Sequence, residues 1–224
     1  VKKAAAYCEK ALRIALDNGF TDTAVETYND LASFQPAEQN EKRLEYFEKG
    51  YELAKKVGDI YFQSWLGLNL CYTYYGRGDV GKAIALMEES VALDRKAGNM
   101  THLSHSLATL GFIHSSEGDW ETAEQCLRES LEISEKLDDF LSKWDSYVSY
   151  GWFYFNREEF SKAKEFYEKA LQVFKTHGAK GSQIWAYRFV IQAYIELGEL
   201  EKAKNLLGDL QEFAVKAENK QLIA

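Results

Sequence analysis

Apolar residues recur along this chain at the spacing of helix faces, and the pattern is clearest between His105 and Asp139. One stripe has the i, i+4, i+7, i+8 and i+11 spacing of a helix face and comprises Leu103, Leu107, Leu110, Gly111 and His114. A second stripe comprises Ala123, Leu127, Ser130, Leu131 and Ile133. Glu117-Gly118-Asp119 lies between the stripes, where glycine can end one helix and aspartate can cap the next. Small residues in both stripes let two helix axes approach closely, so the pattern predicts a hairpin of two helices.

The hairpin pattern repeats at intervals of 40 residues, as from Gly58 to Gly98. The residues expected to end the second helices share this interval: Gly58, Gly98, Asp138, Gly178 and Glu218. The turns within the hairpins also share it: Gly78-Asp79, Gly118-Asp119, Glu158-Glu159 and Gly198-Glu199. An alanine follows each turn at the same distance: Ala83, Ala123, Ala163 and Ala203. Internal repetition in several registers predicts a repeat protein.

The pattern predicts eleven helices of about 14 to 18 residues, with no strands. We expect a single solenoid over residues 1–224, with full repeats at 20–58, 59–98, 99–138, 139–178 and 179–218. Residues 1–19 read as the second helix of a truncated repeat, and residues 219–224 as the start of a further one. A solenoid needs polar caps, and Ala4-Ala5-Ala6 would face a missing neighbour, so we expect a fragment of a longer protein. Arg43 stands where other repeats carry alanine, which predicts looser packing and partial exposure there.

Two hairpins resemble the tetratricopeptide repeat in several positions each. The matching residues are Leu110-Gly111, Gly118-Asp119, Ala123, Leu127 and Ser130-Leu131, then Tyr150-Gly151, Tyr154, Ala163, Tyr167 and Ala170-Leu171. The 40-residue period is longer than the usual 34 and is similar to kinesin light chains, spindle-orientation adaptors and sensor domains of large signalling regulators. The resemblance covers essentially the whole chain. It implies an all-α, right-handed superhelical solenoid of antiparallel hairpins, whose first helices line a concave groove that receives a peptide or partner segment.

The composition and charge of the chain limit the kinds of partner that we expect it to bind. The net charge of −8 argues against a nucleic-acid surface in this region, which would carry a basic stripe. No apolar run approaches the roughly 20 residues that span a bilayer, so we expect no membrane contact. The three cysteines, Cys8, Cys71 and Cys126, have neither metal nor disulfide spacing, and reduced thiols suit a cytoplasmic protein.

We expect no catalytic residue, no metal and no cofactor, and therefore no enzyme. His102 and His105 could share a helix face, but a metal site needs three or four converging ligands. Paired carboxylates such as Glu88-Glu89 are expected in turns and on exposed faces, whereas a general acid–base pair needs burial.

The repeat register also projects the first-helix positions that face away from the hairpin partner. The candidate ligand-binding residues are Trp65, Tyr72, Tyr75, His105, Phe112, Asp145, Trp152, Phe155, Trp185 and Arg188. The same register also projects Glu26, Asn29, Ser33, Leu68, Ala108, Ser115, Val148, Gln192 and Ile195. Two interpretations stay open. In the first, the aromatic residues pack against neighbouring helices as part of the core. In the second, they form a recognition surface, because the contact between the two helices of each hairpin already has large residues of its own.

Tyr72, Phe112 and Trp152 share one position in successive repeats, so on the second interpretation they form a continuous aromatic strip. The family's clamp for a C-terminal carboxylate, built from lysines, arginine and asparagines, is absent. Its asparagine positions carry Ser33, Tyr72, Phe112, Trp152 and Gln192.

The leading hypothesis is a non-enzymatic protein–protein interaction module that binds a peptide or partner segment in this aromatic groove. The alternative is a ligand-sensing module, for a small molecule or sugar, within a signalling or transcription regulator; the flanking domains would discriminate the two. Apolar residues at both ends also predict self-association through exposed solenoid ends: Ala5, Ile14, Leu222 and Ile223.

Overall fold

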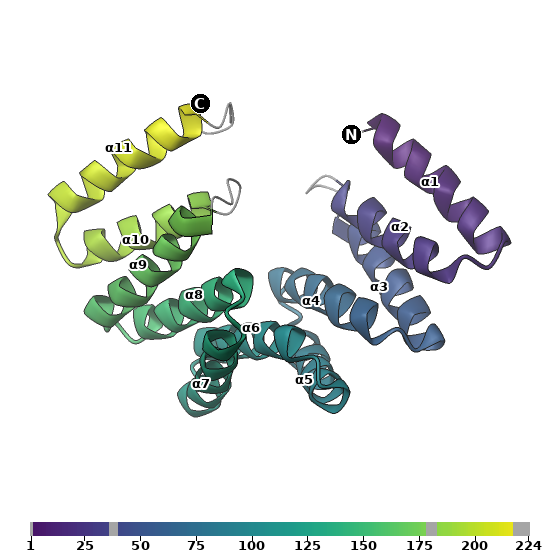
Figure 1. The fold of residues 1–224 in the computed structure, drawn as a ribbon, viewed down its shortest axis with the longest axis horizontal. Coiled ribbons are helices and arrows are strands. Elements are labelled where there is room, and N and C mark those ends of the chain that lie inside the picture. The colour runs from purple at the N-terminus through teal and green to yellow at the C-terminus, as the bar shows by residue number, and fades with distance from the viewer. Residues whose placement is uncertain (1, 36–39, 178–182, 217–224) are drawn as a thin grey trace. The chain divides into compact units, whose positions relative to one another are not determined.

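The computed structural model describes residues 2–35, 40–177 and 183–216, and these form eleven α-helices without a strand (Figure 1). The helices are α1 (Lys2–Asp17), α2 (Thr21–Ser33), α3 (Asn40–Val57), α4 (Ile60–Gly76), α5 (Val80–Ala97), α6 (Met100–Glu117), α7 (Trp120–Leu137), α8 (Phe140–Asn156), α9 (Phe160–His177), α10 (Gln183–Glu196) and α11 (Leu200–Lys216). The predicted all-α fold of antiparallel helix hairpins is confirmed. None of the described helices is both long and apolar enough to cross a membrane.

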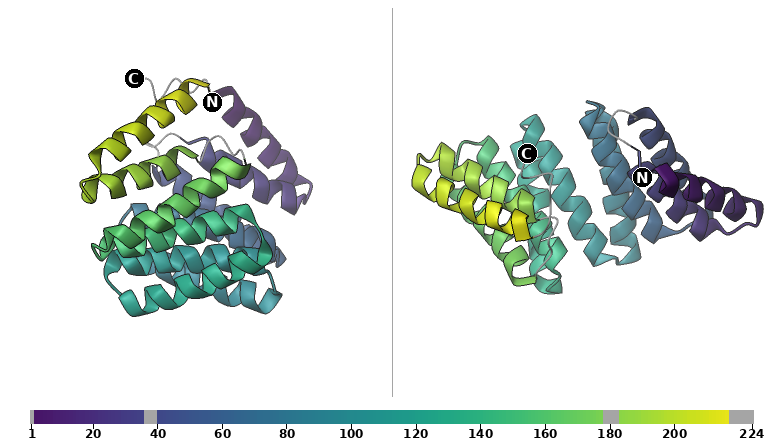
Figure 2. Two further views of the ribbon diagram at one scale, coloured as in Figure 1. Left: turned by 60° about the vertical axis from the view of Figure 1, so that its left-hand side comes forward. Right: turned by 90° about the horizontal axis from the view of Figure 1, so that it is seen from above.

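The chain divides into two compact units, Val1–Ser106 and Leu107–Ala224, with the division inside α6. In unit 1, each of α1 to α4 packs on the next helix in the sequence. In unit 2 the same holds for α7 to α10, each packing on its successor (Figures 1 and 2). Short turns that reverse the chain explain why sequence neighbours are also neighbours in space.

Helix ends fall where the repeat pattern predicts them. The backbone is left-handed directly after α3 at Gly58, after α5 at Gly98 and after α7 at Asp138. The next residue caps the following helix: Asp59 Oδ1 accepts from Phe62 N at 3.0 Å, and Asp139 Oδ2 accepts from Ser142 N at 2.8 Å. Each capped N–H would otherwise lack a partner in the first turn. Two predicted helix-ending residues, Gly178 and Glu218, lie outside the described residues.

The seam within each hairpin contains small residues. Ala123 and Ala163 are fully buried. A Cβ atom added to Gly111 of α6 would lie 2.6 Å from Leu127 Cγ, and one added to Gly151 of α8 would lie 2.3 Å from Tyr167 Cε1. These distances are below any normal carbon–carbon contact, so glycine is required for the two helices to approach this closely.

A buried polar group joins three helices of unit 1. Asp94 of α5 accepts hydrogen bonds from Ser64 Oγ of α4 at 2.5 Å and from Ser106 Oγ of α6 at 3.1 Å. Burial raises the pKa of Asp94, and burial lowers the pKa of the nearby His102. His102 stacks at a tilt on Tyr61, with the ring centroids 5.0 Å apart. Within the described part of the chain, no three histidine, cysteine or acidic side chains form a group that could hold a metal ion.

Candidate functional site

We use the term first-helix surface for the accessible side of the first helices of the hairpins, and we treat the two units separately. In unit 1 it belongs to α2, α4 and the start of α6, and in unit 2 to the rest of α6, α8 and α10. All ten candidate residues lie on these helices, and each is at least partly accessible to solvent: Trp65, Tyr72, Tyr75, His105, Phe112, Asp145, Trp152, Phe155, Trp185 and Arg188.

In unit 1, α4 presents several large side chains to solvent. Trp65 is 45% exposed and Tyr72 is 49% exposed, while Tyr75 is half-buried. Tyr61 lies one turn before Trp65 and meets it edge-to-face at 5.8 Å between ring centroids. An aromatic pair of this kind holds both rings in place, so α4 offers an ordered apolar surface.

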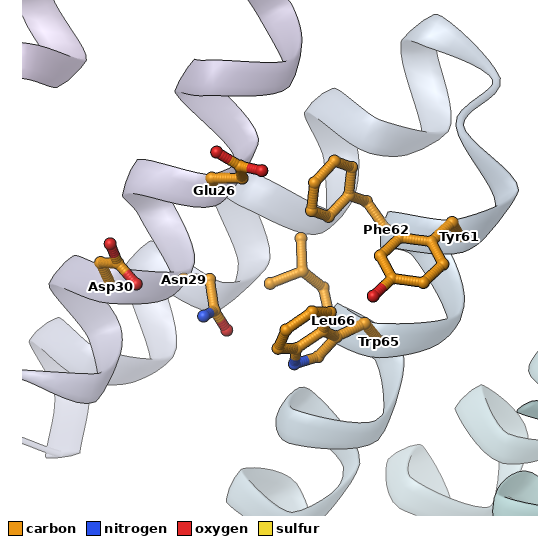
Figure 3. Close-up of a pocket in the computed structure, with 7 residues that line it drawn as sticks. All are labelled: Glu26, Asn29, Asp30, Tyr61, Phe62, Trp65 and Leu66. Atoms are coloured by element: carbon orange, nitrogen blue, oxygen red, sulfur yellow. The ribbon is translucent and has the colours of Figure 1, made fainter.

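A cleft of about 260 Å³ opens between α2 and α4 (Figure 3). Its apolar wall comes from α4 and its polar wall from α2. The lining residues are Glu26, Asn29, Asp30, Tyr61, Phe62, Trp65 and Leu66. Asn69 Nδ2 of α4 donates to Asn29 Oδ1 at 3.2 Å, which ties the two helices together beside the cleft.

A second cleft of about 460 Å³ lies among α3, α4 and α5. Its polar groups are largely engaged inside the protein. The Tyr74 hydroxyl donates to Glu48 at 2.7 Å, and burial together with this bond raises the pKa of Tyr74 to about 12. Lys55 pairs with Glu89 at 2.7 Å. This cleft therefore has fewer uncommitted polar groups than the one between α2 and α4.

In unit 2, three candidate aromatics form one cluster. Phe112 of α6 packs on Trp152 of α8 at 5.3 Å between ring centroids, and Trp152 stacks on Phe155 at 6.3 Å. Trp152 Nε1 donates to Ser116 Oγ at 2.9 Å, and Ser116 Oγ donates to the Phe112 carbonyl at 3.0 Å. The indole N–H of Trp152 is therefore used inside the protein. Its ring remains half-buried, so this residue both packs between helices and reaches the surface.

The last two candidates already contact one another. Trp185 is 53% exposed, and the Arg188 guanidinium carbon lies 4.7 Å from the centroid of its ring. This is a cation–π contact on an exposed tryptophan. Asp145, at the same repeat position on α8, is half-buried.

The surface positions projected from the repeat register differ from the structure in two ways: some projected residues are buried, and some residues of the cleft were not projected. Ala108, Ser115 and Val148 were projected onto the surface, yet all three are buried. Four residues that line the α2–α4 cleft were not projected: Asp30, Tyr61, Phe62 and Leu66. Tyr61 falls four residues before Trp65 on the same helix face, so extending the projection by one turn would have found it.

Comparisons with known proteins support the helical-repeat fold. Residues 62–136 match a family model described as Tetratricopeptide repeat, and residues 145–177 match a second model of that description. A comparison with curated proteins finds no match.

Several solved structures share the fold. BtubC (BKLC) from P. vanneervenii superposes with a TM-score of 0.74 at 17% identity, over 97% of this chain and 92% of that one. A Rap protein complexed with Competence and Sporulation Factor has a TM-score of 0.70 at 15% identity, over 95% of this chain and 58% of that one. A STAND protein with a tetratricopeptide repeat sensor, from Pyrococcus horikoshii, has a TM-score of 0.64 at 18% identity, over 97% of this chain and 37% of that one.

Proposed function

This chain is a tetratricopeptide-repeat protein, and we propose that it is a non-enzymatic interaction module that binds a segment of a partner protein on its first-helix surface. The observation that carries the proposal is the exposure of large aromatic side chains on first helices, namely Trp65 and Tyr72 on α4 and Trp185 on α10. Exposed apolar surface of this kind is characteristic of interaction sites.

Aromatic residues at interfaces contribute disproportionately to affinity. A buried tryptophan or tyrosine anchor is typically worth about 2 kcal/mol or more when truncated to alanine. The cluster around Trp152 supports the proposal in another way, because stacking and the Ser116 bond hold its ring in one orientation before a partner arrives. A pre-ordered ring loses little conformational entropy on binding.

Two similar structures suggest two kinds of ligand. The Rap protein was solved complexed with Competence and Sporulation Factor, which supports a partner held by such repeats. The STAND protein carries its repeats as a sensor, which supports the second candidate, a sensing module for a small molecule. The α2–α4 cleft of about 260 Å³ favours the first candidate, because sites for small molecules usually occupy about 300–1,000 Å³. The cleft of about 460 Å³ among α3, α4 and α5 falls in that range, but Tyr74 with Glu48 and Lys55 with Glu89 already pair there.

Selection from a random peptide library displayed on phage tests the proposal. Peptides enriched on the wild-type protein should bind at least about tenfold more weakly to Trp65→Ala, Tyr72→Ala or Trp185→Ala variants, because each removes one exposed anchor. Tyr7→Ala is the matched control, since Tyr7 is an exposed aromatic on α1, a second helix. Trp152→Ala is less suitable, because it also removes packing and a hydrogen bond.

The selection can fail in two ways. Peptides that bind all three surface variants with wild-type affinity, yet lose binding to Tyr7→Ala, would place the site on second helices and contradict the proposal. If a screen of small molecules found a ligand that binds saturably while the library selection enriched no peptide, the sensing module would replace the interaction module as the proposed function.

A further inference from the structure

Trp65 and Trp185 occupy the same position in their repeats, three periods of 40 residues apart. At Trp185 the chain supplies its own cation, because Arg188 follows three residues later and covers the ring at 4.7 Å. At Trp65 the residue three positions later is Leu68. No lysine or arginine within the described residues covers the rings of Trp65 or Tyr61. Their exposed faces therefore lack the contact that the equivalent tryptophan makes.

The wall opposite Trp65 is acidic. Asp22, Glu26 and Asp30 follow one another at intervals of four residues on α2, and all three are exposed. Two of them, Glu26 and Asp30, line the cleft. Neither forms an ion pair within the described part of the chain, and neither α2 nor α4 contains a lysine or arginine.

Three of the lysines on the neighbouring helix α3 are engaged elsewhere. Lys42 pairs with Glu9 at 3.5 Å, and Lys49 pairs with Glu45 at 2.5 Å. Lys55 pairs with Glu89 on α5. The cleft thus combines the exposed ring of Trp65, which no lysine or arginine of the described residues covers, with two carboxylates that form no ion pair in the same part of the chain.

We propose that the α2–α4 cleft of unit 1 binds an arginine side chain of the partner segment. This inference rests on the proposed function and specifies its ligand. The guanidinium stacks on Trp65, as Arg188 stacks on Trp185, and its N–H groups donate to Glu26 and Asp30. A planar guanidinium can stack on a ring and donate to carboxylates at the same time, which an ammonium group does less well.

Asn29 completes the recognition. Asn29 lines the cleft and its Oδ1 accepts from Asn69 Nδ2, so its amide N–H₂ is the group left to act as a donor. That group can donate a hydrogen bond to a backbone carbonyl of the segment that carries the arginine. The modest volume of the cleft also suits one long side chain.

The test follows the indole N–H signals of the five tryptophans by NMR on the full chain. A Trp65→Phe variant assigns the Trp65 signal. The probe is N-acetyl-arginine N-methylamide, and the control is its citrulline counterpart, which has the same shape without the charge. The arginine compound should shift the Trp65 signal saturably and leave the Trp185 signal in place, because Arg188 covers that ring.

Two comparisons give the expected magnitudes. A Glu26→Gln/Asp30→Asn variant should bind the arginine compound about tenfold more weakly, because both substitutions remove attraction without changing shape. Raised salt should weaken binding to the wild-type protein and have little effect on that variant. Both residues are exposed, so the variant should fold normally.

Three results would overturn the proposal: equal binding of the citrulline compound, equal binding of the lysine counterpart, or unchanged affinity in the double variant. None of these would refute the wider function, since peptides selected from a library could still bind on other first helices. Conversely, arginine binding at Trp65 in a protein that enriches no peptide would support the cleft while contradicting the wider function.

Discussion

Replacing Gly151 with alanine should destabilise the protein, although alanine is the better helix former. The added methyl group would lie 2.3 Å from Tyr167 Cε1 and 2.4 Å from Tyr167 Cδ1. The ring cannot move aside easily, because Tyr167 is fully buried and stacks on Phe189 at 5.1 Å between centroids. Overpacking typically costs about 1–3 kcal/mol, and alanine regains about 1 kcal/mol of helix propensity. An overlap this large belongs at the upper end, so we expect a net loss of about 2 kcal/mol.

Gly208 of α11 offers a matched control in the same unit. A Cβ atom added there meets nothing within 4 Å, so Gly208→Ala should stabilise by up to about 1 kcal/mol. Urea denaturation followed by far-UV circular dichroism should move the two midpoints in opposite directions. Midpoints are the safer comparison, because a repeat protein need not unfold in one step. A Gly151→Ala variant as stable as the wild type would refute the account of the seam.

Three further predictions concern stability and association. Burial lowers the pKa of His102 below its ordinary value of 6.5. As the pH falls below that value, His102 gains a proton in the unfolded state before it does so in the folded state, and the folded state therefore loses stability. His102→Gln should therefore lose less stability than the wild type between about pH 7 and about pH 5.5, measured by thermal denaturation. Ala123→Trp should lower the denaturation midpoint more than Arg43→Ala, since Ala123 is fully buried and Arg43 is partly exposed. Ile14→Ser should weaken self-association in sedimentation, because Ile14 is 49% exposed on the first described helix.

Much of the fold could be predicted because one signal repeats. Gly58 and Gly98 mark helix ends since glycine readily adopts a left-handed backbone. The same period correctly indicated Asp138 and Glu158, which adopt positive φ although they are not glycine. The seam at Gly111 was also predictable, because small residues aligned with a large partner indicate close helix packing.

The candidate site was less predictable, because some contacts between repeats fall outside the 40-residue period. The bond between Trp152 and Ser116 joins residues 36 positions apart, and no spacing rule distinguishes it from many other pairs. Ala108 and Val148 are buried, although the repeat register projected them onto the surface. Asp30 lines a cleft because α4 lies beside α2, which the pattern within a single hairpin does not reveal.

One measurement tests the central claim most directly. The wild-type protein is saturated with a peptide from the library selection, and the shifts of the tryptophan indole N–H signals are compared. Our account predicts that at least one signal from the first helices moves, from Trp65, Trp152 or Trp185, while the signal of Trp120 on the second helix α7 stays in place. A shift of the Trp120 signal alone would place the partner on the other side of the hairpins and contradict the account.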